Sequence, residues 1–202
     1  EFVFGDWSSD VCSSDLRGNN MKRLFYIIPL LLLVLSASAP AFAADWIGEY
    51  CFIARDAAGN EKWSECQHNA LANEGQQEML SVYLQGGTAP TAYAIGLSSM
   101  AFAKTTTYAT ITGEPSGNGY ARQTVNRDAT ASGWPTLALD SGDYKATAKQ
   151  VTFTASGAVG PVTSAFLVSA TNNKLVSYTA LSTSRTLAAG DTLQVTYSVK
   201  LQ

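Results

Sequence analysis

Two cysteines that face each other across a predicted hairpin constrain the fold of this chain most strongly. Residues 46–55 (WIGEYCFIAR) and 61–70 (EKWSECQHNA) are predicted as strands on either side of a short turn that contains Gly and Asn. If the turn is centred after Ala58, Cys51 falls directly opposite Cys66. With a four-residue loop they occupy a non-hydrogen-bonded pair, where side chains lie closest. In an exported protein such a pair predicts a disulfide, and its loop of about 15 residues contributes on the order of 3 kcal/mol.

An export signal precedes the hairpin. The stretch 21–43 has a positive start at Lys22 and Arg23, followed by the apolar run 24–35 (LFYIIPLLLLVL). That run is shorter than the roughly 20 residues that span a bilayer comfortably, although an uncleaved anchor stays an alternative. The predicted cleavage site comprises Ala41 and Ala43, with Ala44 as the first mature residue. We therefore expect secretion across the inner membrane of a bacterium to its outside, with membrane contact only during export.

The residues before the signal are set aside. Residues 1–20 lie upstream of Met21 and show no apolar periodicity, and residues 1–16 resemble a translated sequencing adapter. Cys12 falls in this stretch, which leaves Cys51 and Cys66 as the pair to be joined, and no CxxC or further ligands suggest a redox or metal site instead. The remainder, residues 44–202, has the length of one domain.

The last strand carries the clearest alternation in the chain. Between residues 193 and 201 every second residue is apolar and the residues between are polar, which is typical of a half-buried strand. Other short strand patterns alternate with turns rich in Gly. The sequence therefore predicts a mainly β domain, a β-sandwich or jelly-roll-like fold.

One short α-helix is predicted near residues 74–85. Asn73 is suited to cap it, and Gly86 with Gly87 is suited to end it. We expect its apolar stripe to pack into the core rather than to bind a cofactor or a membrane. The stripe consists of Met79, Leu80, Tyr83 and Leu84.

Composition and motifs argue against catalysis. The formal net charge of −3 makes the chain a poor candidate for binding nucleic acid. The single histidine, His68, lies in a predicted strand, and no G-x-S-x-G elbow presents a nucleophile to it. Asp140 and Asp143 are separated by Ser-Gly, which favours a turn over a carboxylate pair. We therefore expect no catalytic residues, no metal and no cofactor.

Two further groups have open interpretations. Arg122 and Arg185 stand out in a charge-poor chain, and each fits a buried ion pair or a solvated strand residue equally well. Trp46, Trp63 and Trp134 could stack on sugars, although core packing is the expected role of each.

A series of segments carries a family resemblance in its order along the chain. They are GNEKW (59–63), NEG (73–75), GGTAPTAYAIGL (86–97), TGEPSGNGYARQ (112–123), WPTLALDSGDY (134–144), VTFTASG (151–157), GPVTSAFLVSA (160–170) and ALSTSRTLAAGDTLQVTYSVKL (180–201). In these segments the chain resembles a broad group of virion and filament structural proteins that are common in phage genomes. The resemblance implies a β-rich building block, not an enzyme. The export signal and the disulfide depart from the phage pattern and favour an extracellular bacterial assembly.

The leading hypothesis is a non-enzymatic subunit of a pilus-like extracellular filament. Such a subunit would bind copies of itself in a helical homo-oligomer by adding a strand to the edge of a neighbour's sheet. The candidate assembly strands are the first and the last. Their residues are Trp46, Ile47, Tyr50, Phe52, Leu193, Val195, Tyr197, Val199 and Leu201. The alternatives are a phage virion decoration or tail protein and a secreted carbohydrate-binding module that takes glycans.

Overall fold

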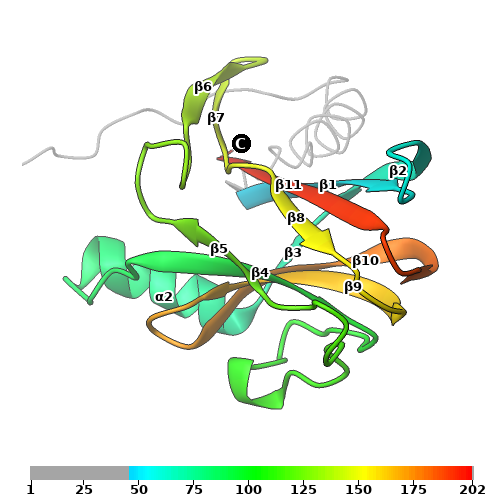
Figure 1. Cartoon of the computed structure of the whole chain (residues 1–202). Coiled ribbons are helices and arrows are strands. Elements are labelled where there is room, and N and C mark those ends of the chain that lie inside the picture. Colours follow the sequence, from blue (N-terminus) through cyan, green and yellow to red (C-terminus); the bar gives the residue numbers. More distant parts are fainter. Residues whose placement is uncertain (1–45, 202) are drawn as a thin grey trace, which may run out of the picture. The chain divides into compact units, whose positions relative to one another are not determined.

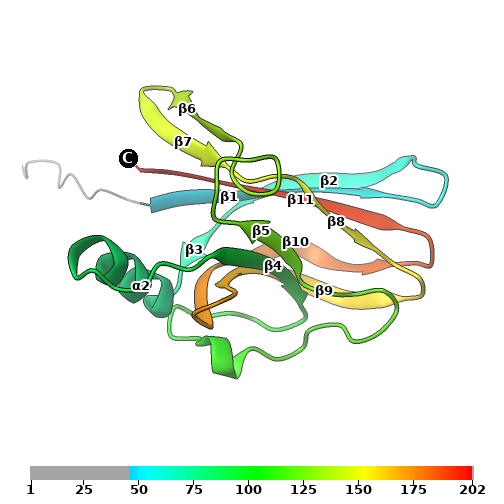
Figure 2. The ribbon, with the colours of Figure 1, turned by 60° about the vertical axis from the view of Figure 1, so that its left-hand side comes forward.

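Alternating apolar residues build two antiparallel sheets that lie face to face (Figures 1 and 2). The computed structural model describes residues 46–201, which fall within one compact unit, Ala43–Gln202. The adapter-like residues 1–20 and the predicted signal peptide with its cleavage residues Ala41, Ala43 and Ala44 lie outside the described residues. The predicted mainly β sandwich is confirmed.

The first sheet has the strand order β2-β1-β11-β7-β6, and β8 also pairs with β11. It contains β1 (Trp46–Arg55), β2 (Glu61–His68), β6 (Thr136–Asp140), β7 (Asp143–Thr147), β8 (Val151–Thr154) and β11 (Thr192–Leu201). The two long central strands pair with each other along their whole length, from Trp46 opposite Leu201 to Arg55 opposite Thr192. The first and last described strands are therefore neighbours in the middle of this sheet.

The second sheet has the strand order β3-β10-β9-β4-β5. It contains β3 (Ala70–Leu71), β4 (Ala92–Ser98), β5 (Gln123–Asn126), β9 (Val159–Ser169) and β10 (Lys174–Leu187). A long connection between β4 and β5 carries a short 3-10 helix, η1 (Tyr108–Thr110). Gly96 in β4 lies directly under the ring of Phe166 in β9, where a Cβ atom would clash with that ring.

Tyrosines join the two sheets inside the core. Tyr50 of β1 and Tyr197 of β11 are buried with their ring centroids 4.6 Å apart. The Tyr50 hydroxyl lies 2.9 Å from Oγ of Ser177 on the opposite sheet, and Asn69 Nδ2 donates to the Tyr197 hydroxyl at 2.9 Å. Burial raises the pKa of both tyrosines, so both hydroxyls stay neutral and hydrogen-bonded in the interior.

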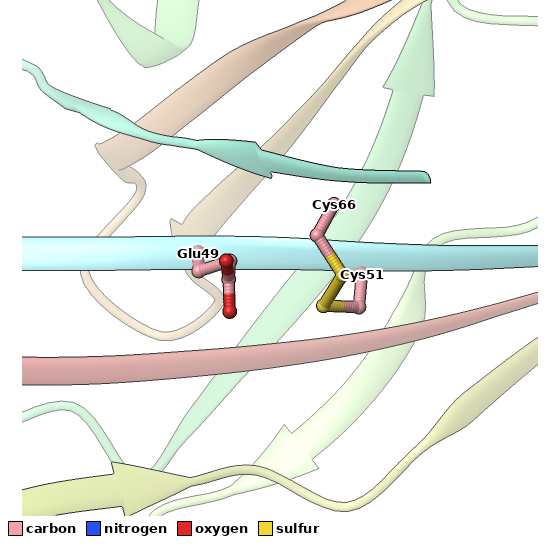
Figure 3. A group of neighbouring side chains, drawn as sticks. All are labelled: Glu49, Cys51 and Cys66. Atoms are coloured by element: carbon pink, nitrogen blue, oxygen red, sulfur yellow. A yellow bond between two sulfur atoms is a disulfide. The ribbon is translucent and has the colours of Figure 1, made fainter. Parts of the chain in front are cut away.

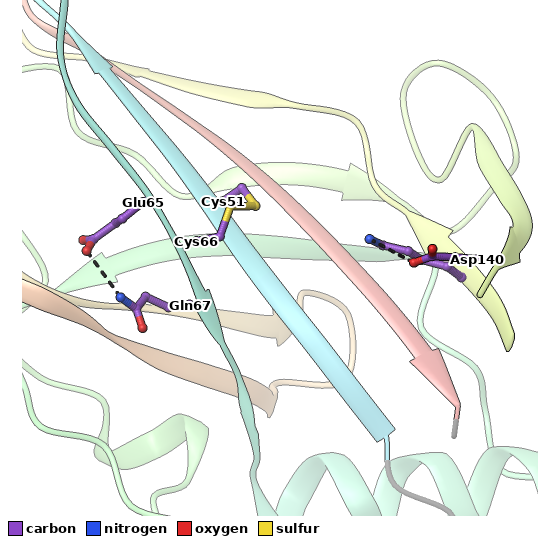
Figure 4. Close-up of a disulfide and its surroundings, with 6 residues drawn as sticks. Cys51, Glu65, Cys66, Gln67 and Asp140 are labelled. Atoms are coloured by element: carbon purple, nitrogen blue, oxygen red, sulfur yellow. Dashed lines mark hydrogen bonds and ion pairs between the residues drawn. A yellow bond between two sulfur atoms is a disulfide. The ribbon is translucent and has the colours of Figure 1, made fainter. Parts of the chain in front are cut away.

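The β1–β2 hairpin forms in the predicted register, with Cys51 opposite Cys66. Their Cα atoms are 4.0 Å apart and their Sγ atoms form a disulfide (Figure 4). The turn is closed by Asp56, whose carboxylate accepts hydrogen bonds from the N–H groups of Ala58 and Asn60, both at 2.9 Å. Because the inward neighbours on β1 are core residues, the disulfide lies on the outer face of the sheet.

The helix α2 (Asn73–Leu84) forms close to the predicted limits, but two details differ. Its N-cap is Ala72 rather than Asn73, and no side chain caps it. Gly75 is buried against β10, where a Cβ atom would clash with the Val176 carbonyl. Gly86 follows the helix with a φ of 69°, which lets the Gly87 N–H reach the Ser81 carbonyl at 2.9 Å.

The predicted core role of the apolar stripe on α2 is wrong for most of its residues. Only Met79 packs against the core, whereas Leu80, Tyr83 and Leu84 are 59%, 81% and 77% exposed. The helix packs on β10 through its first half, around Gly75, and its second half extends past the strands at one end of the sandwich (Figure 2). The apolar residues do repeat at helical spacing, but no other described element covers the second half of the helix.

Candidate functional site

The cysteine pair is a structural cross-link and does not form a metal site. Within residues 46–201, Glu49, Cys51 and Cys66 are the one group of three candidate ligands that lie within 4.8 Å of one another (Figure 3). Both sulfurs are consumed by the disulfide, so neither is a thiolate that could bind a cation. A single carboxylate remains, which does not make a metal site.

His68 and the two aspartates lie in ordinary structural positions. His68 is exposed at the end of β2, and its backbone carbonyl accepts a hydrogen bond from Oγ1 of Thr179 at 2.8 Å. Asp140 and Asp143 are the paired residues that close the β6–β7 turn, as the Ser-Gly spacing predicts. Asp140, labelled in Figure 4, also has its carboxylate 3.6 Å from Lys145 Nζ, and both side chains of this ion pair are half-buried.

The two conspicuous arginines differ. Arg122 forms an ion pair with Glu114, and its guanidinium lies over the rings of Tyr108 and Phe166, 5.1 Å from each centroid. The hydrogen bonds that Arg122 donates to the Glu114 carboxylate raise the pKa of Arg122 further, and the cluster fastens the long β4–β5 connection to the second sheet. Arg185 instead lies over the ring of Trp63, 4.7 Å from its centroid, and no ion pair to it is present among the described residues.

The tryptophans are partly buried against the core, as expected for packing residues. Trp134 is wedged edge-on between Tyr93 and Tyr197, with centroid distances of 6.0 and 5.9 Å. Trp63 is covered by Arg185, and Trp46 packs against the same core at the start of β1. None of them forms an open aromatic platform on the described surface.

The strands that the sequence suggests as assembly edges are not edges. β1 is paired with β11 on one side and β2 on the other, and β11 is paired with β1 on one side and with β7 and β8 on the other. Their backbone groups are therefore already used within the chain. Tyr50, Phe52, Leu193, Val195, Tyr197 and Val199 are buried in the core, Trp46 and Ile47 are half-buried, and Leu201 is exposed. The expectation that these strands offer free edges is corrected: strand addition would have to use β2, β3, β5, β6 or β8, which each pair with one other strand.

Four of these five outer strands are short, charged or covered. β8 (Val151–Thr154) has four residues, and the Ser156 N–H just after it donates to the Asn118 carbonyl at 2.9 Å, so the loop before β5 lies beside its end. The exposed positions of β2 include Glu61 and Lys62, and charges on an edge oppose strand addition. β3 has two residues. The N–H of Asn126 at the end of β5 donates to the Ser132 carbonyl at 3.0 Å, so the following loop covers that edge. β6 differs, because it carries Leu137 and Leu139 in an exposed strand (Thr136–Asp140) at the margin of the sheet.

One end of the sandwich gathers the large exposed apolar side chains. They lie on the second half of α2, on the β6–β7 hairpin and on the last described residue of β11, elements that Figure 2 shows at the same end. We call this surface the apolar end. Its side chains, which are 59–81% exposed, are Leu80, Tyr83, Leu84, Leu137, Leu139, Tyr144 and Leu201.

A small cavity opens between the parts of the apolar end. It has a volume of about 180 Å³ and lies between α2 and both sheets. Met79 and Tyr83 line it from the helix and Ala146 from β7. The lining is mostly apolar, and Glu78 and Arg127 add one charge of each sign to it.

The exposed side chains of the apolar end lie on α2, on the β6–β7 hairpin and at the end of β11. Large apolar side chains gain free energy when they are removed from water, and groups of them on a surface mark sites of association. The apolar end is therefore the candidate interaction surface of the described residues.

The comparison with known proteins agrees with a structural role. Residues 70–200 match the model of the family described as Podophage GP4 fiber I protein gp80. The chain belongs to this fibre family. The match begins at the first residue of β3, so it includes α2, the β6–β7 hairpin and nearly all of β11, whereas the disulfide hairpin precedes it.

Family membership confirms the resemblance to phage structural proteins and places the chain in a class of virion-associated, extracellular proteins. No curated protein and no solved structure matches the chain. Among the described residues, no helix is both long and apolar enough to cross a membrane.

The sequence interpretation missed the β6–β7 hairpin as a candidate surface. Its signal is present in TLALDSGDY (136–144): alternating leucines lead directly into a two-residue turn. The turn was recognisable, but the exposure of the leucines was not, because alternation alone does not say whether another layer covers the apolar face.

Proposed function

We propose that the chain is a non-enzymatic structural subunit of a phage tail fibre that lies on the outside of the virion and associates with copies of itself through the apolar end. The observation that carries this proposal is the family match over residues 70–200. The apolar end supports it, since a surface of this chemistry is costly to leave in water.

A phage tail protein was the alternative to a pilus-like filament on the sequence alone. A pilus-like bacterial filament stays a second candidate because of one structural observation, the Cys51–Cys66 disulfide. Disulfides persist in oxidising compartments and are rare in the cytosol, where virions are assembled. A fibre subunit that acquires its disulfide after release of the virion, or that uses the predicted export signal 21–43, would reconcile both observations.

Immunolocalisation tests the proposal. Antibodies raised against the purified chain are applied to virions from the source sample and examined by immunogold electron microscopy. We expect gold on the tail fibres and peptides from residues 70–200 in the proteome of the purified particles. Gold on cell-surface filaments with none on virions would overturn the phage assignment in favour of the filament. Pre-immune serum is the matched control.

A further inference from the structure

The β6–β7 hairpin has a well-defined register. Its strands pair from Thr136 opposite Thr147 to Asp140 opposite Asp143, around the two-residue turn Ser141–Gly142. The φ angles of the turn residues are 56° and 99°, the left-handed conformation that two-residue hairpin turns require. β7 pairs with β11 over residues 145–147, so the turn end of the hairpin extends beyond β11 (Figures 1 and 2).

This register fixes which backbone groups point outward from β6. The pair that closes a two-residue turn is hydrogen-bonded, and pairs alternate from there along the strand. Leu139 and Leu137 therefore fall at non-hydrogen-bonded pairs with β7, and their N–H and C=O groups point away from it. Among the described residues no hydrogen bond reaches these outward groups.

The same alternation gives the hairpin one apolar face. Leu137 faces Ala146 and Leu139 faces Tyr144 across the two strands, so all four side chains project on one side. Ala146 lines the cavity at the apolar end, and the other three are 64–69% exposed. The apolar face is thus an uncovered continuation of the core face of the first sheet.

We propose that β6 pairs with β6 of a second copy of this chain, antiparallel, around a twofold axis at Ala138. This inference rests on the self-association in the proposed function and names the contact that forms it. Leu137 N–H and C=O would exchange hydrogen bonds with Leu139 of the second copy, and the symmetry repeats this exchange on the other side of the axis. The two hairpins become one four-stranded sheet with a continuous apolar face.

The sequence of β6 is self-complementary in this register. On the apolar face each Leu137 lies opposite a Leu139, and on the other face Ala138 lies opposite itself. Asp140 lies opposite Thr136, so no like charges meet across the new pair. A pairing shifted by two residues toward the turn would bring Asp140 opposite itself, which the repulsion of like charges disfavours.

The other edge of the first sheet is a poorer partner for β6 than a second copy of β6. An open, head-to-tail extension of the first sheet would need β6 to meet β2, whose exposed positions carry Glu61, Lys62 and His68. A charged edge opposes pairing, whereas β6 offers an apolar one. The isologous contact instead places the apolar edge of β6 against an identical apolar edge.

Cysteine cross-linking tests both the contact and its register. The chain is expressed from Met21, without Cys12, so that Ala138→Cys adds the one cysteine outside the disulfide. At the axis the two Cα atoms are about 4.5 Å apart, within disulfide reach. We expect Ala138→Cys to run as a dimer on non-reducing gels after mild oxidation, with the new bond mapped between position 138 of two chains.

Matched variants separate specific pairing from chance collision. Ala58→Cys, in the exposed turn of the β1–β2 hairpin, should run as an uncross-linked single chain on the same non-reducing gels. Leu137→Cys or Leu139→Cys alone should cross-link poorly, because each faces its own copy only diagonally at about 7–8 Å. A mixture of these two variants should cross-link efficiently, because they lie directly opposite each other.

A further variant tests the edge without a cysteine. Leu137→Lys places a charge on β6 and should convert the sedimenting species from dimer to monomer while the melting temperature of the monomer is unchanged. Equal cross-linking of Ala58→Cys and Ala138→Cys, or absence of dimer at all positions, would overturn the β6 contact. If the β6 contact fails in this way but immunogold still labels the virion fibres, the proposed function stands. Failure of the contact and failure of the proposed function are therefore distinguishable.

Discussion

The two ends of the sandwich are built on opposite principles. At one end, which we call the turn end, the β1–β2 turn (56–60), the β8–β9 turn (155–158) and the β10–β11 turn (188–191) lie together (Figure 2). Lys62 Nζ lies 2.6 Å from the carboxylate of Asp191, and the Gly190 N–H donates to the Ala155 carbonyl at 2.7 Å. The apolar end instead exposes leucines and tyrosines. The turn end is thus completed by contacts within the chain, and we propose that the apolar end is completed by association with a second copy.

The largest change in the free energy of unfolding should come from removing the disulfide, which cross-links the β1–β2 hairpin. Replacing both partners, Cys51→Ala with Cys66→Ala, should lower the free energy of unfolding by about 3 kcal/mol, since the unfolded chain loses a loop constraint. Urea unfolding followed by circular dichroism measures this change. The oligomeric state of the folded variant should equal that of the unaltered chain, because the disulfide joins β1 to β2, whereas β6 pairs with β7. A loss of association together with the disulfide would contradict the separation of the two ends.

The next largest change in stability should come from a substitution at Gly75. This glycine sets the position of α2, which carries part of the apolar end. Gly75→Ala places a Cβ atom against the Val176 carbonyl and should cost about 1–3 kcal/mol of unfolding free energy. The matched control is Gln77→Ala, an exposed position on the same helix, which should change stability by less than about 0.5 kcal/mol. Equal effects of the two variants would show that α2 does not depend on this close packing.

A smaller effect is expected from Asp191, the buried acid of the turn end. Hydrogen bonds from Lys62 and from the Ala188 N–H lower the pKa of this carboxyl. Asp191→Asn should cost about 1–2 kcal/mol at neutral pH, through the loss of a charged hydrogen bond. The lowered pKa stabilises the fold above the unfolded value of about 3.9, and this contribution disappears as the pH falls through the folded value.

The pH dependence of unfolding checks that prediction. The difference in unfolding free energy between the unaltered chain and Asp191→Asn should be largest at neutral pH. It should disappear in acid, below about pH 4. Asp140→Asn at the apolar end is the control, because its ion pair with Lys145 is partly exposed and should contribute less than about 1 kcal/mol. A difference that persists in acid would rule out the charge as its cause.

The smallest effect on stability should come from the exposed residues of α2. Leu84→Ser should change the free energy of unfolding of the monomer by less than about 0.5 kcal/mol, because the side chain is already in water. Met79→Ala, five residues earlier and packed against the core, should cost at least about 1 kcal/mol. Thermal melts at low protein concentration compare the two. A large loss for Leu84→Ser would mean that the stripe is buried in solution.

Local features of the fold were readable from the sequence alone. The register of Cys51 with Cys66, the alternation of the last strand and the turn at 140–143 each depend on residues close together in the chain. The helix was readable for the same reason. Its N-cap was misplaced by one residue, because Asn73 has a suitable side chain but the backbone begins its first turn there.

The candidate site depended on contacts between distant residues, which only the tertiary structure decided. Trp46 and Leu201 lie opposite each other in the middle of a sheet, so the two strands with the best sequence patterns are not edges. Leu80 and Met79 are neighbours on a regular apolar stripe, yet only Met79 finds a partner. Period and hydropathy determine which face of an element is apolar. Which apolar faces the chain covers itself, and which it leaves exposed, depends on how the sheets and the helix pack.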